Sequence, residues 1–208
     1  MEFSTPEQIN GKHYYKNSNE VKELLNTTED YFPISIESLS SIINISIAKF
    51  NLDVNFIIKN DIEYMLGNTL GRQLEYLLSE HISPFNTVNL HYKQGNEGNE
   101  PDLKCIENDI YSIEVKTSKT LIKDPNKCRP IITGNSSYAR DKQDETSKKT
   151  KNHYYILINY KYENYKIINY KAWFGFILQS DWLIPNKGAA SKLNIDNIEV
   201  QKRLVEIC

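Results

Sequence analysis

The feature that most constrains the fold is a pair of long, apolar, β-prone segments in the C-terminal half of the chain. Residues 153–162 read HYYILINYKY and residues 165–178 read YKIINYKAWFGFIL, with Glu163 and Asn164 between them. β-branched and aromatic residues favour strands, and the continuous apolar run of the first segment is typical of a strand buried on both faces. The pair therefore predicts two strands at the centre of a sheet.

Helical patterns precede these strands. Residues 18–26 predict a short helix capped by Ser18 or Asn19, and residues 35–52 predict a second helix capped by Ser35. Residues 60–82 give the clearest helical pattern, with apolar side chains repeating at intervals of three and four. Strand patterns at residues 87–92, 102–107 and 110–116 follow, and a short helix is expected near the C-terminus.

This order predicts an α/β fold with a mixed central β-sheet flanked by helices. The 208 residues suit a single domain, residues 1–208. Within it, residues 1–60 are expected to form a helical N-terminal part and residues 62–180 the core.

Composition limits the cellular setting. No apolar run approaches the roughly 18–20 residues of a transmembrane helix, and the polar N-terminus lacks the pattern of a signal peptide. The three cysteines, Cys105, Cys128 and Cys208, have no CxxC spacing, and their odd number argues against a disulfide framework. We therefore expect a reduced, cytoplasmic protein without a membrane partner.

The charge is distributed unevenly along the chain. Residues 1–110 hold 8 Lys/Arg against 17 Asp/Glu, whereas residues 116–151 hold 10 against 4, although the whole chain carries a net charge of only −2. Such asymmetry predicts a surface after residue 115 that faces a polyanion. A solvated basic loop is the alternative.

Charged side chains interrupt an otherwise apolar strand in EPDLKCIENDIYSIEVK, residues 100–116. Because side chains alternate along a strand, Glu114 and Lys116 share one face, and Ile113 and Val115 share the other. A two-residue turn at 108–109 would place Asp102 opposite Val115, on the wrong side. A three-residue loop or one bulge places Asp102 opposite Glu114 or Lys116, and we predict one of these irregularities.

Two carboxylates on neighbouring strands are the oxygen ligands that Mg²⁺ takes together with substrate phosphate. Asp102, Glu114 and the carbonyl of Val115 are therefore the candidate metal ligands. Lys116 is placed to orient or deprotonate an attacking water and to offset transition-state charge. These parts suffice for hydrolysis of a phosphodiester.

Pro101-Asp102, eleven intervening residues and Glu114-Val115-Lys116 resemble the PD-(D/E)xK motif of metal-dependent nucleases. The resemblance implies a restriction-endonuclease-like core, with residues 62–180 as the catalytic part. It also implies a glutamate contributed by the preceding helix. Glu75 is the first candidate and Glu80 the second, and a solvated surface glutamate is the alternative for either.

Within that superfamily, the chain is most similar to type II restriction endonucleases. Its size, its lack of a second domain and the blocks at 134–142 and 173–182 carry this resemblance. It implies Mg²⁺-dependent cleavage of double-stranded DNA at a short, palindromic sequence by a homodimer. A cognate DNA methyltransferase would belong to the same system.

The basic region after residue 115 supplies the candidate DNA contacts, because lysines and arginines contact phosphates while polar side chains read base edges. The candidates are Lys119, Asn135, Ser136, Ser137, Tyr138, Arg140, Lys142, Lys148, Lys149 and Lys151. Two other functions remain open. One is a repair or junction-resolving nuclease of the same fold, and the other is a non-catalytic nucleic-acid- or protein-binding module.

Overall fold

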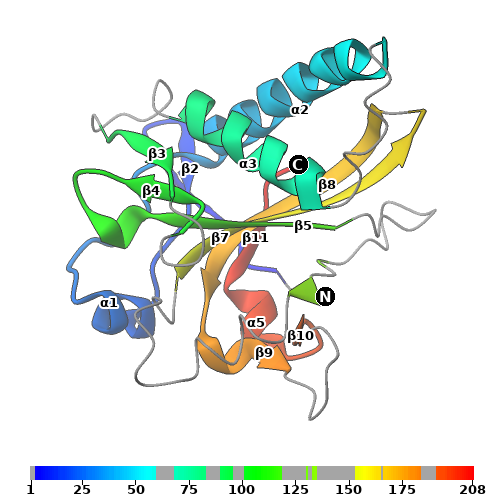
Figure 1. Ribbon diagram of the computed structural model, residues 1–208. Helices are drawn as coiled ribbons and strands as arrows, with labels where there is room; N and C mark the ends of the chain where they lie inside the picture. Colours follow the sequence, from blue (N-terminus) through cyan, green and yellow to red (C-terminus); the bar gives the residue numbers. More distant parts are fainter. Residues whose placement is uncertain are drawn as a thin grey trace.

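The computed structural model describes residues 3–59, 68–82, 90–95, 101–118, 130, 133–134, 153–164, 166–183 and 191–208. Its centre is a six-stranded sheet in the order β11-β8-β7-β5-β4-β3 (Figure 1). The strands are β3 (Tyr92–Gln94), β4 (Leu103–Cys105), β5 (Ile113–Ser118), β7 (His153–Glu163), β8 (Lys166–Ile177) and β11 (Leu204–Glu206). Strands β5 and β7 run parallel and the other neighbours antiparallel. The predicted mixed sheet is confirmed.

The long hairpin formed by β7 and β8 is the predicted strand pair. Residues 153–160 of β7 are all buried, as expected of a strand covered on both faces. Asn164 turns the chain with a φ of 48°, a left-handed conformation that asparagine tolerates better than most residues. The hairpin thus provides the rigid centre onto which the other strands are added.

Two helices cover one face of the sheet. In Figure 1, α2 (Ile36–Lys59) and α3 (Asn68–Ile82) lie above it. Ser35 begins α2 as predicted, because its hydroxyl accepts the backbone N–H of Ser38 at 3.2 Å. Buried leucines of α3 share one apolar core with Ile113 and Val115 of β5. The apolar side of β5 therefore anchors the helical layer.

The N-terminal part packs into the same core. It contains α1 (Asn19–Leu25), capped by Ser18 as predicted. It also contains a hairpin of β1 (Glu7–Ile9) and β2 (Lys12–Tyr14), which the helical interpretation of residues 1–60 did not include. Strand formation there depends on the tight turn at Asn10-Gly11, where both residues have positive φ.

The opposite face of the sheet is covered by C-terminal elements. Tyr155, Leu157 and Trp173 pack there against α5 (Ile198–Lys202), β9 (Trp182–Leu183) and β10 (Ser191–Leu193). Strands β9 and β10 form a small sheet with β6 (Thr133–Gly134). Glu114 and Lys116 pair with Tyr155 and Leu157 in the parallel register. They therefore stand on a different side of β5 from the helix-facing core.

Two boundaries differ from the sequence predictions. The described part of the 87–92 segment becomes a strand only at Tyr92, because pairing with β4 begins at Tyr92 and Cys105. The expected C-terminal helix ends at Lys202, and the chain then joins the edge of β8 as β11. Within the described residues, no helix has the length and apolarity needed to cross a membrane.

Candidate functional site

The β4–β5 hairpin places Asp102 beside Glu114. Leu103 pairs with Ile113, and one further step in this antiparallel register brings Asp102 opposite Glu114. Residues 106–112, an odd number, connect the strands and include the 3₁₀ turn Asp109–Tyr111. Asp102 therefore lies opposite Glu114 as predicted, but through this longer odd-numbered connection rather than through the expected three-residue loop or bulge.

The ammonium group of Lys116 lies among three oxygen atoms. Its Nζ donates to Glu114 Oε1 at 2.7 Å and to the carbonyl oxygen of Val115 at 3.1 Å, and it lies 3.6 Å from Asp102 Oδ2. Asp102 Oδ2 also accepts the backbone N–H of Val115 at 2.8 Å. This bond ties the beginning of β4 to the middle of β5 and fixes the direction of the aspartate.

The cluster is largely withdrawn from solvent. Glu114 is 3% exposed, whereas the side chains of Lys116 and Asp102 are 20% and 24% exposed. Burial alone would lower the pKa of Lys116, but the negative charges of Glu114 and Asp102 outweigh it and raise the pKa. The lysine is therefore charged at neutral pH, and one edge of the cluster opens to solvent.

Helix α3 brings Glu75 to the same cluster. The helix contacts both β4 and β5, and Leu74, Leu77 and Leu78 hold it in the core. Burial first, and then the charge of Asp102, raise the pKa of Glu75 to about 7. The charge of Lys116 acts in the opposite direction. Glu75 thus lies within electrostatic reach of the hairpin residues.

Glu80, the second candidate from this helix, is placed differently. Its side chain is exposed and accepts a hydrogen bond from Tyr76 on the same helix. The structure therefore favours Glu75 over Glu80. Arg72, one turn before Glu75, also acts on the Glu75 carboxyl. The sequence analysis did not single out Arg72, although its three-residue spacing from Glu75 is a usable signal.

The oxygen atoms around Lys116 suit a hard cation. Carboxylate and carbonyl oxygens are the ligands that Mg²⁺ and Ca²⁺ prefer, and the present arrangement already holds one positive charge. In the part of the chain that the structure describes, no group of three or more His, Cys, Asp or Glu side chains is arranged to hold a metal. A metal at this hairpin would thus use the carboxylates of Asp102 and Glu114 and the Val115 carbonyl.

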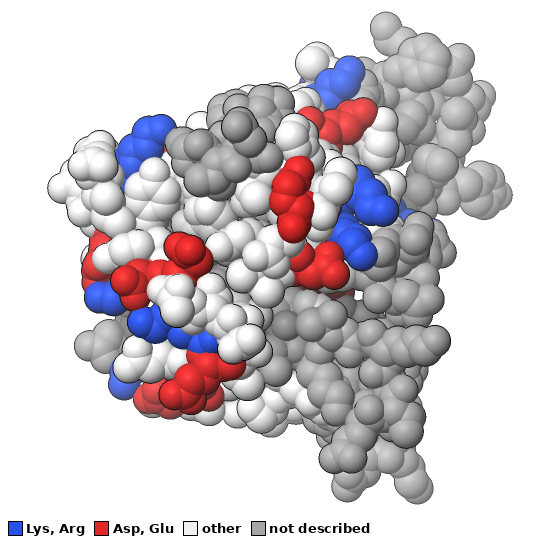
Figure 2. Space-filling view, turned by 90° about the vertical axis from the view of Figure 1, so that its left-hand side faces the viewer, with Lys and Arg blue, Asp and Glu red and all other residues white. Residues whose placement is uncertain are grey.

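The candidate DNA contacts lie outside the described residues. These are Lys119, Asn135, Ser136, Ser137, Tyr138, Arg140, Lys142, Lys148, Lys149 and Lys151. On the face of the molecule shown in Figure 2, acidic and basic side chains of the described residues are interspersed. This face offers no broad basic surface from its described residues, so the polyanion-facing surface is still assigned by sequence alone.

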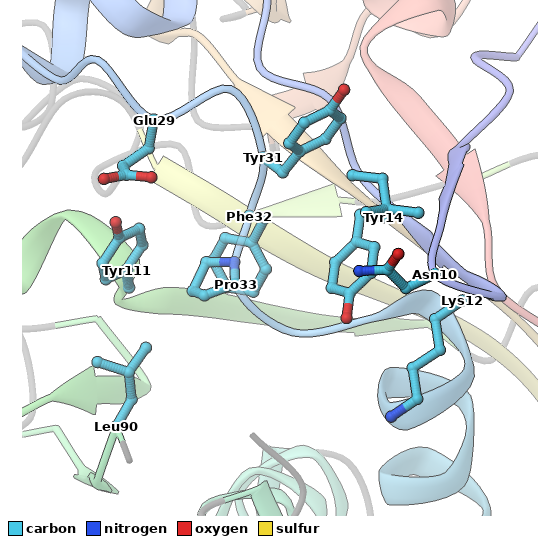
Figure 3. A pocket seen from close by; sticks show the side chains of 10 residues that line it. Asn10, Lys12, Tyr14, Glu29, Tyr31, Phe32, Pro33, Leu90 and Tyr111 are labelled. Carbon is cyan, nitrogen blue, oxygen red and sulfur yellow. The ribbon is translucent and has the colours of Figure 1, made fainter. Parts of the chain in front are cut away.

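A separate cavity of about 580 Å³ lies between the β1–β2 hairpin, the chain at residues 29–33 and the 3₁₀ turn Asp109–Tyr111 (Figure 3). Four of its ten lining residues are aromatic, and the Tyr111 hydroxyl points toward Glu29 (Figure 3). The residues that line it are Ile9, Asn10, Lys12, Tyr14, Glu29, Tyr31, Phe32, Pro33, Leu90 and Tyr111. Asp102, Glu114 and Lys116 are not among them. The hairpin cluster, which is Asp102, Glu114 and Lys116 of the β4–β5 hairpin, brings opposite charges together. It is therefore the better candidate for a catalytic site.

One comparison with known proteins gave a match. A family model described as ScaI restriction endonuclease matches residues 7–208, which include every member of the hairpin cluster. Neither the curated proteins nor the solved structures gave a match.

Proposed function

The chain belongs to the ScaI restriction endonuclease family, and on this premise we propose that it is a Mg²⁺-dependent nuclease of the PD-(D/E)xK type. Membership makes it a type II restriction endonuclease, a hydrolase that acts on DNA. The proposal adds the metal, the residues of the site and the form of the substrate, a short palindromic sequence in double-stranded DNA.

One observation supports the metal site above all. Asp102, Glu114 and the Val115 carbonyl direct three oxygen atoms at one cationic group. When bound there, Mg²⁺ would offset charge on the phosphate and activate water for attack. Asp102 is held in place by the Val115 N–H. Its orientation therefore does not depend on the cation.

The remaining side chains have distinct proposed roles. Lys116 remains charged at neutral pH, so its ammonium group would orient the attacking water and stabilise negative charge on the phosphate in the transition state. Glu75, with a pKa of about 7, would take up or release a proton at its carboxyl group near neutrality. Both side chains would act at the partly exposed edge of the cluster.

The proposed assembly is a homodimer, because a two-fold symmetric protein matches a palindromic site. The basic region from Lys119 to Lys151 would contact phosphates and base edges. A DNA methyltransferase of the same specificity would protect the host genome. Sedimentation of the protein with and without a palindromic duplex tests the dimer.

The function is tested by incubating the protein with phage DNA and Mg²⁺. We expect discrete fragments, no cleavage in excess EDTA, and a loss of at least ~10²-fold in rate for Lys116→Ala and Glu114→Gln, as is usual for groups that serve proton transfer or charge stabilisation. Lys171→Ala is a matched control, because Lys171 makes a 2.7 Å ion pair with Glu206 elsewhere in the sheet.

The outcomes separate the alternatives. Cleavage that follows DNA structure and yields no discrete fragments would indicate a repair or junction-resolving nuclease. DNA binding that persists with no cleavage under any divalent metal would indicate a non-catalytic module. Unchanged cleavage by the Lys116→Ala variant would place the active site away from the β4–β5 hairpin.

A further inference from the structure

Lys116 occupies the position that a metal ion would need. Its Nζ contacts Glu114 Oε1 at 2.7 Å and the Val115 carbonyl oxygen at 3.1 Å, and Asp102 Oδ2 lies 3.6 Å away. These are the three oxygen atoms of the proposed metal site. A catalytic lysine that only served water or phosphate would not need to contact the complete ligand set.

We propose that Lys116 is a built-in placeholder cation, which neutralises the site before the metal arrives and must withdraw for the metal to bind. The inference rests on the proposed function, because it assumes that these three oxygens hold the metal. It assigns Lys116 a second role, as a competitor that sets the metal affinity.

Electrostatics require a cation at this position. Glu114 is almost fully buried, and its carboxylate and that of Asp102 lie 2.7 Å and 3.6 Å from the same nitrogen atom, so the two carboxylates repel one another. A buried carboxylate without a partner is costly. The ammonium group of Lys116 relieves this cost, and a divalent ion would relieve it as well.

The two cations exclude each other. Both need the same oxygen lone pairs, and two positive charges at neighbouring positions repel strongly in a partly buried site. Lysine can leave without disturbing β5, because its charge stands on a flexible four-carbon stem and its side chain is 20% exposed. Once displaced, the ammonium group remains close enough to act on the phosphate.

Metal affinity without DNA is the direct test. Mn²⁺ and Ca²⁺ are titrated calorimetrically into the full-length protein and into Lys116→Met and Lys116→Gln, which remove the charge, and Lys116→Arg, which keeps it. We expect about tenfold tighter binding by the two neutral variants, a coupling of ordinary size between two ligands. Lys116→Arg should bind no more tightly than the wild type.

Lys171→Met is the matched control. Lys171 pairs with one carboxylate, that of Glu206, at 2.7 Å, and its side chain is 18% exposed, close to the exposure of Lys116. Its loss should leave metal affinity unchanged.

Thermal unfolding provides a second readout. Lys116→Met should melt lower than the wild type without metal, and saturating Mn²⁺ should raise its Tm more than that of the wild type.

The results distinguish the two proposals. If Lys116→Met and Lys116→Gln fold and bind metal as weakly as the wild type or more weakly, the placeholder role is overturned while the metal site stands. If no variant binds Mn²⁺ or Ca²⁺, both the placeholder role and the proposed metal site fail. Equal tightening by Lys171→Met would indicate a general charge effect and would also overturn the placeholder role.

Discussion

At the β4–β5 hairpin, Glu75 approaches the cluster from α3, and its situation differs from that of Glu114. Glu114 accepts a hydrogen bond from Lys116 at 2.7 Å, so its charge is compensated directly. Glu75 experiences burial and the charges of Asp102 and Glu114, and its pKa rises to about 7. The two glutamates, Glu75 and Glu114, thus have different electrostatic environments within one site.

The raised pKa of Glu75 makes stability depend on pH. The folded protein holds the Glu75 proton up to about pH 7, whereas the unfolded chain releases it near the ordinary value of 4.5. The stabilisation is therefore complete below about pH 4.5 and is lost as the pH rises through about 7. Without divalent metal, Glu75→Gln should exceed the wild type in Tm by about 2–4 °C at pH 8, the effect of ~1 kcal/mol in a domain of this size.

Thermal unfolding of both proteins at pH 5 and pH 8 checks this prediction. The advantage of Glu75→Gln should shrink at pH 5, where the wild-type carboxyl is largely protonated. Glu80→Gln is the matched control, because Glu80 lies on the exposed side of the same helix. An advantage of equal size at both pH values would show that Glu75 is not under electrostatic strain.

At the scale of elements, local patterns predicted the two longest strands, β7 and β8. The runs that became β7 and β8 are long, apolar and separated by Glu163 and Asn164. Both strands and the turn between them could therefore be predicted from the sequence. β11 was not predicted, because Leu204–Glu206 is only three residues long and its state depends on pairing with a distant strand. The 3₁₀ turn in the β4–β5 connection depends instead on local contacts, among them the hydrogen bonds from Ile110 N–H to Asn108 Oδ1 and from Tyr111 N–H to the Asn108 carbonyl oxygen.

In the candidate site, too, local sequence patterns predicted some features and tertiary packing decided the others. Strand alternation placed Glu114 and Lys116 on one face, and the parity of the connection placed Asp102 beside them. The choice between Glu75 and Glu80 required the structure, because both lie on α3 and only packing decides which one faces the hairpin. The contact of Lys116 with all three oxygens was also invisible in sequence, since it depends on the lysine rotamer.

The attachment of β11 to β8 depends on Gly175. A Cβ atom at this position would lie 1.9 Å from the carbonyl oxygen of Arg203, which precedes β11. Gly175→Ala should therefore force the two strands apart and destabilise the protein by about 3 kcal/mol, the upper part of the range for overpacking. Urea denaturation measures the loss.

Gly11→Ala is the comparison for this prediction. A Cβ there meets nothing within 4 Å, but Gly11 has a φ of 81°, so only backbone strain of about 1 kcal/mol is expected. If Gly175→Ala costs no more than Gly11→Ala, close approach of the Arg203 carbonyl is not what requires glycine at position 175.

For the whole molecule, the sequence places opposite charges in different regions. The first 110 residues are strongly acidic, and residues 116–151 are basic. DNA is a polyanion, so this distribution should orient the protein with residues 116–151 toward the duplex and the N-terminal part away from it. The N-terminal lysines are partly neutralised already, since Lys16 pairs with Glu7 at 2.6 Å and Lys22 with Asp30 at 2.9 Å.

Salt dependence of DNA binding tests this orientation. In a Glu114→Gln background, chosen because the proposed site should then not cleave, replacement of Lys148, Lys149 and Lys151 by alanine should reduce the slope of log K against log [salt] by about 2.7, because each phosphate contact contributes about 0.9. Replacement of Lys12, Lys16 and Lys22 should leave the slope unchanged. The slope is measured by fluorescence anisotropy with a duplex that contains the recognition sequence. Equal changes in the two triple variants would mean that DNA responds to total charge rather than to a basic surface formed by residues 116–151.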